Sequence, residues 1–221
     1  MKVHGILLAA GKSIRFEENK LFYVINNAPI IKYPIDTFIN SLHIDTITVT
    51  SSKENQKKIE KLFSHKLLEK ITFIEGGNSR NESEVIALSH LEEQLIDGSY
   101  LVVIHDAARA FLTPNLLERL ILHALEFGSA SPYLYSGLLV DEKKEIANEE
   151  IVEIQTPQIF DFENLMSAYK KANIDSFDSA DTTECISKYT NITPQLIEGE
   201  IINKKITYKK DICELRELLS V

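Results

Sequence analysis

The stretch KVHGILLAAGKSIRF at residues 2–16 decides the fold class of this chain. Its first part, KVHGILL, is mostly apolar and predicts a buried strand that ends at the small residues of AAGKS. Small residues at 9–11 let backbone N–H groups approach a ligand closely, and a turn rich in N–H groups attracts phosphate. Arg15 and Lys20 follow, and their cationic groups can bind phosphate oxygens. The stretch therefore predicts a strand that leads into an anion-binding loop, an arrangement typical of α/β proteins.

This loop is not specific by itself. It matches neither the G-x-x-x-x-G-K-[ST] phosphate loop nor the G-x-G-x-x-G dinucleotide loop. A solvated turn between a strand and a helix explains the same residues equally well. Support for a ligand site must therefore come from other segments of the chain.

Strands and helices are expected to alternate up to residue 128. Segment 113–128 carries clear helix signals, because Thr113 suits the N-cap, Pro114 the first helical position and Gly128 the position beyond the end. Segment 100–109, YLVVIHDAAR, is the most apolar strand and should be central. This alternation predicts a parallel, doubly wound sheet with right-handed crossovers. Strands are expected at 2–8, 46–52, 71–77 and 100–109, and helices at 29–41, 53–63, 79–95 and 113–128.

The pattern is less regular after residue 129. The segment SASPYLYSGLLVDEKKEIANEEIVEIQ predicts two or three short strands with an acidic, lysine-containing turn. We expect these strands to leave the main sheet as a hairpin-like arm near residues 131–155. No repeat, low-complexity tract or linker divides the sequence, so residues 1–221 are expected to form one domain. Further elements are expected as a helix at 161–172, a strand within 192–199 and a closing helix at 209–219.

The composition argues against several classes of protein. A formal net charge of −9 and a pI near 5.2 disfavour a general nucleic-acid binder or a protein of anionic membrane surfaces. The sequence contains no run of about 18 apolar residues, so no membrane span is expected. The first residues turn polar too early for a signal peptide. Cys185 and Cys213 lie far apart and suggest neither a disulfide framework nor a metal site, so we expect a reducing, cytoplasmic location. Any anionic ligand must therefore be met by a local cluster of cations.

A second segment at a predicted strand end carries candidate ligand groups. In EGGNSRNES, Gly76 and Gly77 can admit a flat base against the backbone, Ser83 can hydrogen-bond the edge of that base, and Arg80 adds a cation. A tight turn followed by a helix cap explains this segment as well. Because ligands of open α/β sheets bind where strands deliver their carboxyl ends, we expect such segments to converge on one edge of the sheet.

The segment IHDAAR ends the strongest predicted strand. Asp106 can hold Mg²⁺ or a sugar hydroxyl, and Ala107 and Ala108 leave room for a ligand. Alternatively, Asp106 only caps the next segment and pairs with Arg109. His105 faces the opposite side of the strand, which disfavours a His-Asp catalytic pair.

A lysine-rich segment, EGEIINKKITYKKD, lies near the C-terminus. Most lysines in such a run are solvated. Alternation along KKITYK would turn Lys205 and Thr207 to one face and Lys204 to the other. Lys205 is the lysine that we expect to reach a ligand.

Taken together, these segments resemble the 2-C-methyl-D-erythritol 4-phosphate cytidylyltransferase family, and the resemblance runs through nearly the whole chain. LLAAGKSIRF is similar to the family's triphosphate loop, EGGNSRNES to its base-and-ribose loop, and VIHDAARAF and IQTPQIF to two of its signatures. EGEIINKKIT corresponds to the late segment whose lysine meets substrate phosphate. The resemblance implies a Rossmann-like nucleotidyltransferase fold, with a mostly parallel central sheet, helices on both faces and a protruding β arm.

The resemblance also implies an activity, in which the phosphate of 2-C-methyl-D-erythritol 4-phosphate attacks the α-phosphorus of CTP with Mg²⁺ present. Pyrophosphate leaves, no covalent enzyme intermediate forms, and the product serves isoprenoid precursor synthesis. The implied catalytic residues are Arg15, Lys20 and Lys205. The implied nucleotide-binding residues are Ala9, Ala10, Gly11, Gly76, Gly77, Arg80, Ser83, Asp106 and Ala107. The implied acceptor-binding residues are Asp106, Arg109, Thr182 and Lys205, with Asp106 also as the metal ligand. In this family the arm packs against a second copy, so a homodimer is implied.

The sequence departs from the family's pattern on the acceptor side. The arm's usual arginine has no counterpart, since no arginine lies between Arg119 and Arg216, and the family's Asp-Thr element is not evident. The first loop also lacks the usual Pro-Lys-Gln triplet. Two alternatives therefore stay open: the same fold acting on ribitol 5-phosphate or another polyol phosphate, and a non-catalytic homologue that binds a nucleotide.

Overall fold

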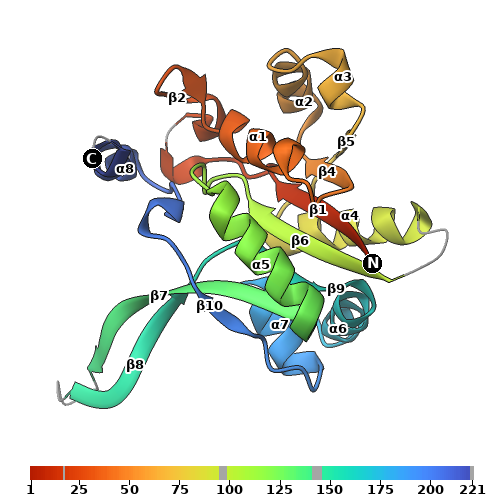
Figure 1. Cartoon of the computed structure of the whole chain (residues 1–221), viewed down its shortest axis with the longest axis vertical. Coiled ribbons are helices and arrows are strands. Elements are labelled where there is room, and N and C mark those ends of the chain that lie inside the picture. Colours follow the sequence, from red (N-terminus) through yellow and green to blue (C-terminus); the bar gives the residue numbers. More distant parts are fainter. Residues whose placement is uncertain (17, 95–98, 141–145, 220–221) are drawn as a thin grey trace.

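The computed structural model describes residues 1–16, 18–94, 99–140 and 146–219. Its central feature is an eight-stranded sheet with the order β10-β7-β9-β6-β1-β4-β5, in which β8 pairs with β7 (Figure 1). The strands of this sheet are β1 (Lys2–Leu8), β4 (Thr46–Thr50), β5 (Ile71–Ile74), β6 (Tyr100–Asp106), β7 (Ser129–Val140), β8 (Ile146–Ile154), β9 (Gln158–Asp161) and β10 (Leu196–Glu198). A small second sheet pairs β2 (Val24–Ile25) with β3 (Ala28–Pro29).

The register of the central strands explains where a ligand can bind. β1 lies between β6 and β4 and is parallel to both. Leu8, the last residue of β1, pairs with Asp106 of β6 and with Thr50 of β4. The three strands therefore end at the same level, and the loops that follow them open onto one edge of the sheet.

Helices cover both faces of the sheet, as the sequence predicts (Figure 1). Because side chains alternate along a strand, each buried strand contributes to two cores. Val103 of β6 lies in the core formed with α1, α5 and α8, whereas Val102 and Ile104 lie in the core formed with α4, α6 and α7. The helices are α1 (Lys32–Asn40), α2 (Lys53–Glu60), α3 (His65–Leu68), α4 (Arg80–Gln94), α5 (Pro114–Phe127), α6 (Phe162–Ile174), α7 (Thr182–Tyr189) and α8 (Lys209–Leu219), and the 3₁₀ turns are η1 (Ile14–Phe16), η2 (Lys20–Phe22) and η3 (Ile201–Asn203).

Helix α5 shows how local sequence sets the ends of a helix. The Thr113 hydroxyl accepts a hydrogen bond from the Leu116 N–H at 3.0 Å, Pro114 occupies the first helical position, and Gly128 ends the helix with φ +79°. All three signals expected from the sequence are confirmed. Within the described ranges, no helix combines the length and the apolar character that crossing a membrane requires.

Several elements differ from the sequence-based expectations. β9 has no counterpart in the expected elements; it enters the sheet antiparallel between β6 and β7, and the sheet is mostly parallel, as the family resemblance implies. The helix expected from residue 29 begins at Lys32, because Ala28 and Pro29 pair with β2 instead. α7 is absent from the expectations, although Asp181 caps it by accepting a hydrogen bond from the Glu184 N–H at 2.8 Å. An Asp three residues before a Glu is a helix-start signal that the sequence itself carries.

The arm consists of β7 and β8, which project from the body of the molecule (Figure 1). Both strands are longer than expected, and their antiparallel register runs from the Tyr133–Ile154 pair toward the tip. At Gly137 the register shifts and φ is +136°, which glycine accepts without a steric cost. The expected turn at 141–145 lies outside the described residues. Two expectations stay predictions. One is that the arm joins two copies of the chain, and the other is that residues 1–221 form a single domain.

Two buried histidines determine part of the pH dependence of stability. Burial is the main cause that lowers the pKa of both His4 and His105 to about 4. The unfolded chain takes up these protons near the ordinary value of 6.5. The two histidines stay neutral in the folded chain until about pH 4. Their contribution to the free energy of unfolding is therefore complete above about pH 6.5 and is lost as the pH falls toward 4.

We therefore expect the urea midpoint to fall between about pH 7 and about pH 4.5. In His105→Gln the midpoint should fall by less, because one of the two proton sites is gone. His65→Gln is the matched control, since the His65 side chain is 97% exposed. Equal falls in His105→Gln and wild type would contradict the assignment to His105.

Candidate functional site

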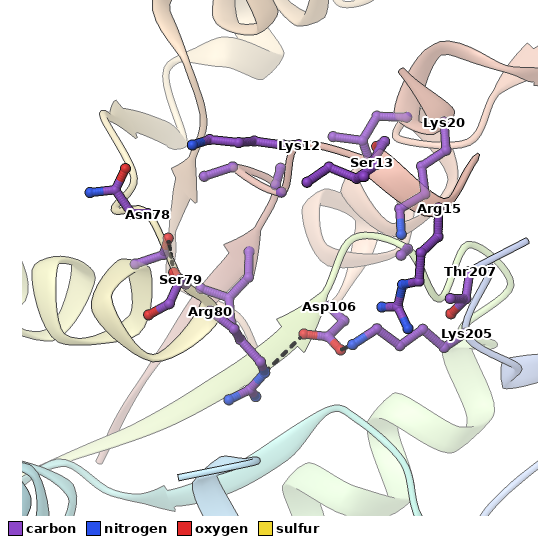
Figure 2. Close-up of a pocket in the computed structure, with 18 of the residues that line it drawn as sticks. Lys12, Ser13, Arg15, Lys20, Asn78, Ser79, Arg80, Asp106, Lys205 and Thr207 are labelled. Carbon is purple, nitrogen blue, oxygen red and sulfur yellow. Dashed lines mark hydrogen bonds and ion pairs between the residues drawn. The ribbon is translucent and has the colours of Figure 1, made fainter. Parts of the chain in front are cut away.

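A pocket of about 330 Å³ opens at the edge where β1 and β6 end. The segments expected to converge there do so: the loops after β1, β5 and β6 meet the segment that precedes α8 (Figure 2). The residues that line it are 8–15, Lys20, Leu21, 77–80, Ser83, Asp106, Ala108, Lys205 and Thr207. Its cationic side chains are Lys12, Arg15, Lys20, Arg80 and Lys205. Among the described lining residues Asp106 carries the one carboxylate, so the pocket is positive within a chain of net charge −9.

The loop after β1 is fixed at both ends. The Ala9 N–H donates to the Thr50 carbonyl at 2.9 Å, which ties the start of the loop to β4. Phe16 is fully buried and anchors η1, while Arg15 on the same turn stays exposed and lines the pocket. The Arg15 guanidinium lies 5.7 Å from the centre of the Tyr208 ring. The loop therefore offers Arg15 to a ligand from an anchored backbone.

Lys20 begins η2, and its neighbour Leu21 is buried. Lys20 Nζ donates to the Ile206 carbonyl at 2.9 Å. Burial first, and then the positive charge of Lys205, lower the pKa of Lys20 from its ordinary value. Figure 2 shows Lys20, Arg15 and Lys205 on the same side of the pocket. A partly desolvated ammonium that is held in place interacts strongly with an anion entering this pocket.

The loop after β5 is a tight turn closed by Ser83. The Gly77 N–H donates to Ser83 Oγ at 3.0 Å, and the Ser83 hydroxyl donates to the Ser79 carbonyl at 2.8 Å. A Cβ on Gly76 would lie 2.3 Å from the Ala10 Cβ, so glycine lets this loop lie directly against the loop after β1. The segment is thus a tight turn that also contributes Gly77 and Ser83 to the pocket.

Asp106 lies between two cations at the end of β6 (Figure 2). Its Oδ1 accepts from Arg80 Nε at 3.2 Å and its Oδ2 accepts from Lys205 Nζ at 2.5 Å. Burial by itself would raise the pKa of Asp106, but the charges of Arg80 and Lys205 outweigh burial and hold that pKa well below its usual range. The carboxylate therefore stays ionised and orients both cations, in place of the helix cap and the Arg109 pair considered from the sequence.

The lysine-rich segment turns its side chains as expected. Lys205 and Thr207 line the pocket. Lys204 points away from the pocket and forms an ion pair with Glu214. Its Nζ also lies 3.8 Å from Asp211 Oδ1. The expected alternation is confirmed, although these residues form no regular strand.

Three candidate residues from the sequence lie behind the pocket lining. Gly76 packs against the first loop, and Ala107 is fully buried. Arg109 is 5% exposed and donates to the Asn203 carbonyl at 3.0 Å and to the Ile154 carbonyl at 3.4 Å. The Arg109 side chain thus connects the base of the arm to η3, and its Nη2 also lies 3.7 Å from Glu153 Oε1. Its expected role in binding the acceptor stays a prediction.

Thr182 also lies behind the lining. Its hydroxyl donates to Glu84 Oε1 at 2.7 Å and accepts from Arg80 Nη2 at 3.3 Å. Thr182 is fully buried, so the structure places it as a support of Arg80 rather than in the pocket wall. Burial would lower the pKa of Arg80, but Glu84 and Asp106 raise it above the ordinary value.

Four polar lining residues have no place in the sequence argument above. Lys12 and Ser13 follow the glycine of the first loop, and Asn78 and Ser79 follow the glycine pair of the second. Their position directly after a loop glycine is the signal that could have found them. Glu84 had a weaker signal, since it lies four residues after Arg80 on a predicted helix.

Comparisons with known proteins show the family of this chain. The model of the 2-C-methyl-D-erythritol 4-phosphate cytidylyltransferase family matches residues 3–220. The protein of that name from Thermotoga neapolitana is 32% identical over 223 residues, covering 98% of this chain and 96% of the relative. The protein of the same name from Dictyoglomus thermophilum is 33% identical over 232 residues, covering 99% and 97%.

Solved structures share the fold. The bifunctional IspDF of Campylobacter jejuni superposes with a TM-score of 0.78 and 30% identity, over 97% of this chain and 54% of that one. The 4-diphosphocytidyl-2C-methyl-D-erythritol synthase of Anaerococcus prevotii gives a TM-score of 0.80 at 22% identity, over 100% and 99%, which shows likeness of fold alone. The match of the family model over nearly the whole length shows that this chain belongs to the 2-C-methyl-D-erythritol 4-phosphate cytidylyltransferase family.

Proposed function

We propose that this chain transfers CMP from CTP to 2-C-methyl-D-erythritol 4-phosphate and releases pyrophosphate, a step of isoprenoid precursor synthesis. The observation that carries the proposal is the cationic pocket at the strand ends of a chain in this family. A nucleoside triphosphate and a phosphorylated acceptor together bring several negative charges. A focused cluster of cations can bind them although the rest of the chain is acidic.

The proposed reaction is a direct phosphoryl substitution. An oxygen of the acceptor phosphate attacks the α-phosphorus of CTP, the bond from that phosphorus to the oxygen bridging to the β-phosphate breaks, and the electron pair leaves with pyrophosphate. Arg15 and Lys20 bind the triphosphate and neutralise charge that develops on it. Lys205, oriented by Asp106, binds the α-phosphate or the incoming phosphate. Catalysis is then positioning and charge stabilisation by side chains that form no covalent bond to the substrate.

The cytidine is assigned to the two glycine-containing loops. Gly77 and Ser83 line the pocket from the loop after β5, and the backbone of Ala9 and Ala10 lines it from the loop after β1. The close packing of Gly76 on Ala10 brings these two loops together. Ala10 and Gly77 are half-buried, and a flat base fits against them at the pocket wall.

We propose Mg²⁺ as the cofactor. Mg²⁺ is usually held by one or two carboxylates together with substrate phosphates. Asp106 is the one carboxylate among the described lining residues, and its two oxygens also accept hydrogen bonds from Arg80 and Lys205. No group of three or more His, Cys, Asp or Glu that could hold a metal occurs in the described ranges. This donor set fits an ion that arrives with the nucleotide, and Mg²⁺ would supply charge neutralisation on the phosphates.

We further propose a cytoplasmic homodimer that joins through the arm and binds neither nucleic acid nor membrane. The arm extends away from the body (Figure 1), and we expect a second copy to pack against it there. Cys185 and Cys213 are both free, in keeping with a reducing compartment. Light scattering of the full chain measures the dimer directly.

The proposed function is tested by pyrophosphate release from CTP and Mg²⁺ with three acceptors: 2-C-methyl-D-erythritol 4-phosphate, ribitol 5-phosphate and glycerol 3-phosphate. We expect turnover with the first, because the family model matches nearly the whole chain. UTP in place of CTP is the control for base recognition.

Turnover only with ribitol 5-phosphate or glycerol 3-phosphate would keep the nucleotide site and overturn the acceptor. The missing arm arginine between Arg119 and Arg216 makes this outcome worth measuring. Binding of CTP without turnover on any acceptor would support a non-catalytic homologue.

A further inference from the structure

Glu84 is a buried carboxylate that the proposed reaction does not use. It lies on α4 and is fully buried. Its Oε1 accepts from the Tyr169 hydroxyl at 2.5 Å and from the Thr182 hydroxyl at 2.7 Å, and its Oε2 accepts from Arg80 Nη1 at 2.7 Å. A buried carboxylate is costly unless donors surround it. Here the donors come from α4, α6 and α7, so three separate helices hold this one group.

The consequence of this arrangement is a fixed Arg80 guanidinium. Arg80 Nη1 meets Glu84, and Arg80 Nη2 meets the Thr182 hydroxyl at 3.3 Å. The guanidinium is planar and rigid, so holding two of its nitrogens also sets the direction of the third. That third nitrogen, Nε, donates to Asp106 Oδ1 at 3.2 Å.

The same line of contacts continues into the pocket. Asp106 Oδ2 accepts from Lys205 Nζ at 2.5 Å. Charges therefore alternate from the core to the pocket: Glu84 is negative, Arg80 positive, Asp106 negative and Lys205 positive. Figure 2 shows the last three in this order.

We infer that Glu84 is a positioning residue, which locks Arg80 in the orientation that holds Asp106 and, through Asp106, the Lys205 ammonium. The inference rests on the proposed function, because it assigns Lys205 to a reacting phosphate. Glu84 is fully buried and acts only through Arg80.

A stabilising role alone accounts poorly for this carboxylate. Apolar residues of similar volume often replace buried ion pairs with no loss of stability. Glu84 also lies among apolar neighbours, since Ala87, Leu88 and Leu91 of the same helix are core residues. Charge stabilisation in a pocket does need groups fixed in advance, and displacement by about 1 Å can cost about a hundredfold in rate.

The test compares wild type, Glu84→Gln, Arg80→Gln and the double variant in the pyrophosphate-release assay, with urea unfolding measured on each. Glutamine keeps the shape of Glu84 but removes the negative charge that pairs with Arg80 and replaces one of the two acceptor oxygens with an NH2 donor. We expect Glu84→Gln to lower kcat about tenfold to a hundredfold and to leave KM for CTP within about threefold. Glu92→Gln is the matched control, since Glu92 is on the same helix and only pairs with Lys170 at the surface.

The double variant separates positioning from folding. If Glu84 acts through Arg80, adding Glu84→Gln to Arg80→Gln lowers kcat no further. Multiplied losses in the double variant, or a wild-type kcat in Glu84→Gln, would overturn the inference. A wild-type protein that releases no pyrophosphate would overturn the proposed function instead. The four proteins are then compared by titration with Mg-CTP, where we expect the affinity of Glu84→Gln to stay within about threefold of wild type. A larger loss of affinity would show that Glu84 supports nucleotide binding and would overturn the positioning role.

Discussion

Replacing Lys20 with alanine should lower kcat by about a hundredfold or more, the scale of losing one charge partner of a transition state. Lys20 Nζ donates to the Ile206 carbonyl and is partly buried. Water that enters after its removal therefore compensates poorly for the lost positive charge. Pyrophosphate release at saturating CTP and acceptor gives kcat. Lys66→Ala is the matched control, because Lys66 is an exposed lysine on α3. Unchanged turnover in Lys20→Ala would remove Lys20 from the mechanism.

The pKa of Lys20 gives this prediction a second measurement. Burial, followed by the charge of Lys205, lowers the pKa of Lys20, so its ammonium loses the proton below the ordinary value of 10.5. The pH dependence of kcat/KM reports groups of the free enzyme, so kcat/KM should decline on the alkaline side below that value. In Lys20→Arg the decline should move to higher pH, because a guanidinium keeps its proton. An identical alkaline limb in both proteins would assign it to another group.

The second large effect is expected for Asp106→Asn, which should lower kcat about a hundredfold and weaken CTP binding without unfolding the protein. Asparagine has nearly the same shape but no charge, so Arg80 and Lys205 lose the carboxylate that they share and repel each other. The assay is again pyrophosphate release, with CTP titration and thermal unfolding on the same samples.

Asp178→Asn is the control for this variant, because Asp178 is an exposed carboxylate before α7. The pKa of Asp106 lies well below its usual range, so an acid limb of activity above about pH 5 should be the same in wild type and Asp106→Asn. Loss of the folded state in Asp106→Asn would instead show that its charge pairs are needed for stability.

Much of the pocket lining could be predicted because its signals are local. Each of these signals can be recognised from a few neighbouring residues. They are the small residues of AAGK, the glycine pair 76–77 and the strand end at Asp106. Parallel strands that end at one level then bring such loops together, which the pairing of Leu8 with Asp106 confirms. The placement of Thr182 and Arg109 was less predictable, because both lie behind the lining and their contacts come from segments far away in the chain. Their expected role in binding the acceptor stays a prediction.

The elements that escaped prediction have physical reasons of their own. β9 is short, and its place between β6 and β7 depends on pairing with strands distant in the chain. The start of α1 shifted because Pro29 lies in a pair with β2 that no periodic pattern reveals. α7 carries its cap in Asp181, so its absence from the expectations reflects an unused signal.

By itself, the sequence determined the alternation of strands and helices, both ends of α5 and the cations that follow the first strand, because these depend on residues within a few positions of one another. Only the tertiary structure decided which charges meet. Arg80 and Asp106 are 26 residues apart, and Asp106 and Lys205 are 99 apart. The order of the sheet and the packing of α4 against α6 and α7 bring them together, and no local pattern encodes either. The loops that follow β1 and β5 are thus properties of the sequence, and the line of charges from Glu84 to Lys205 is a property of the fold.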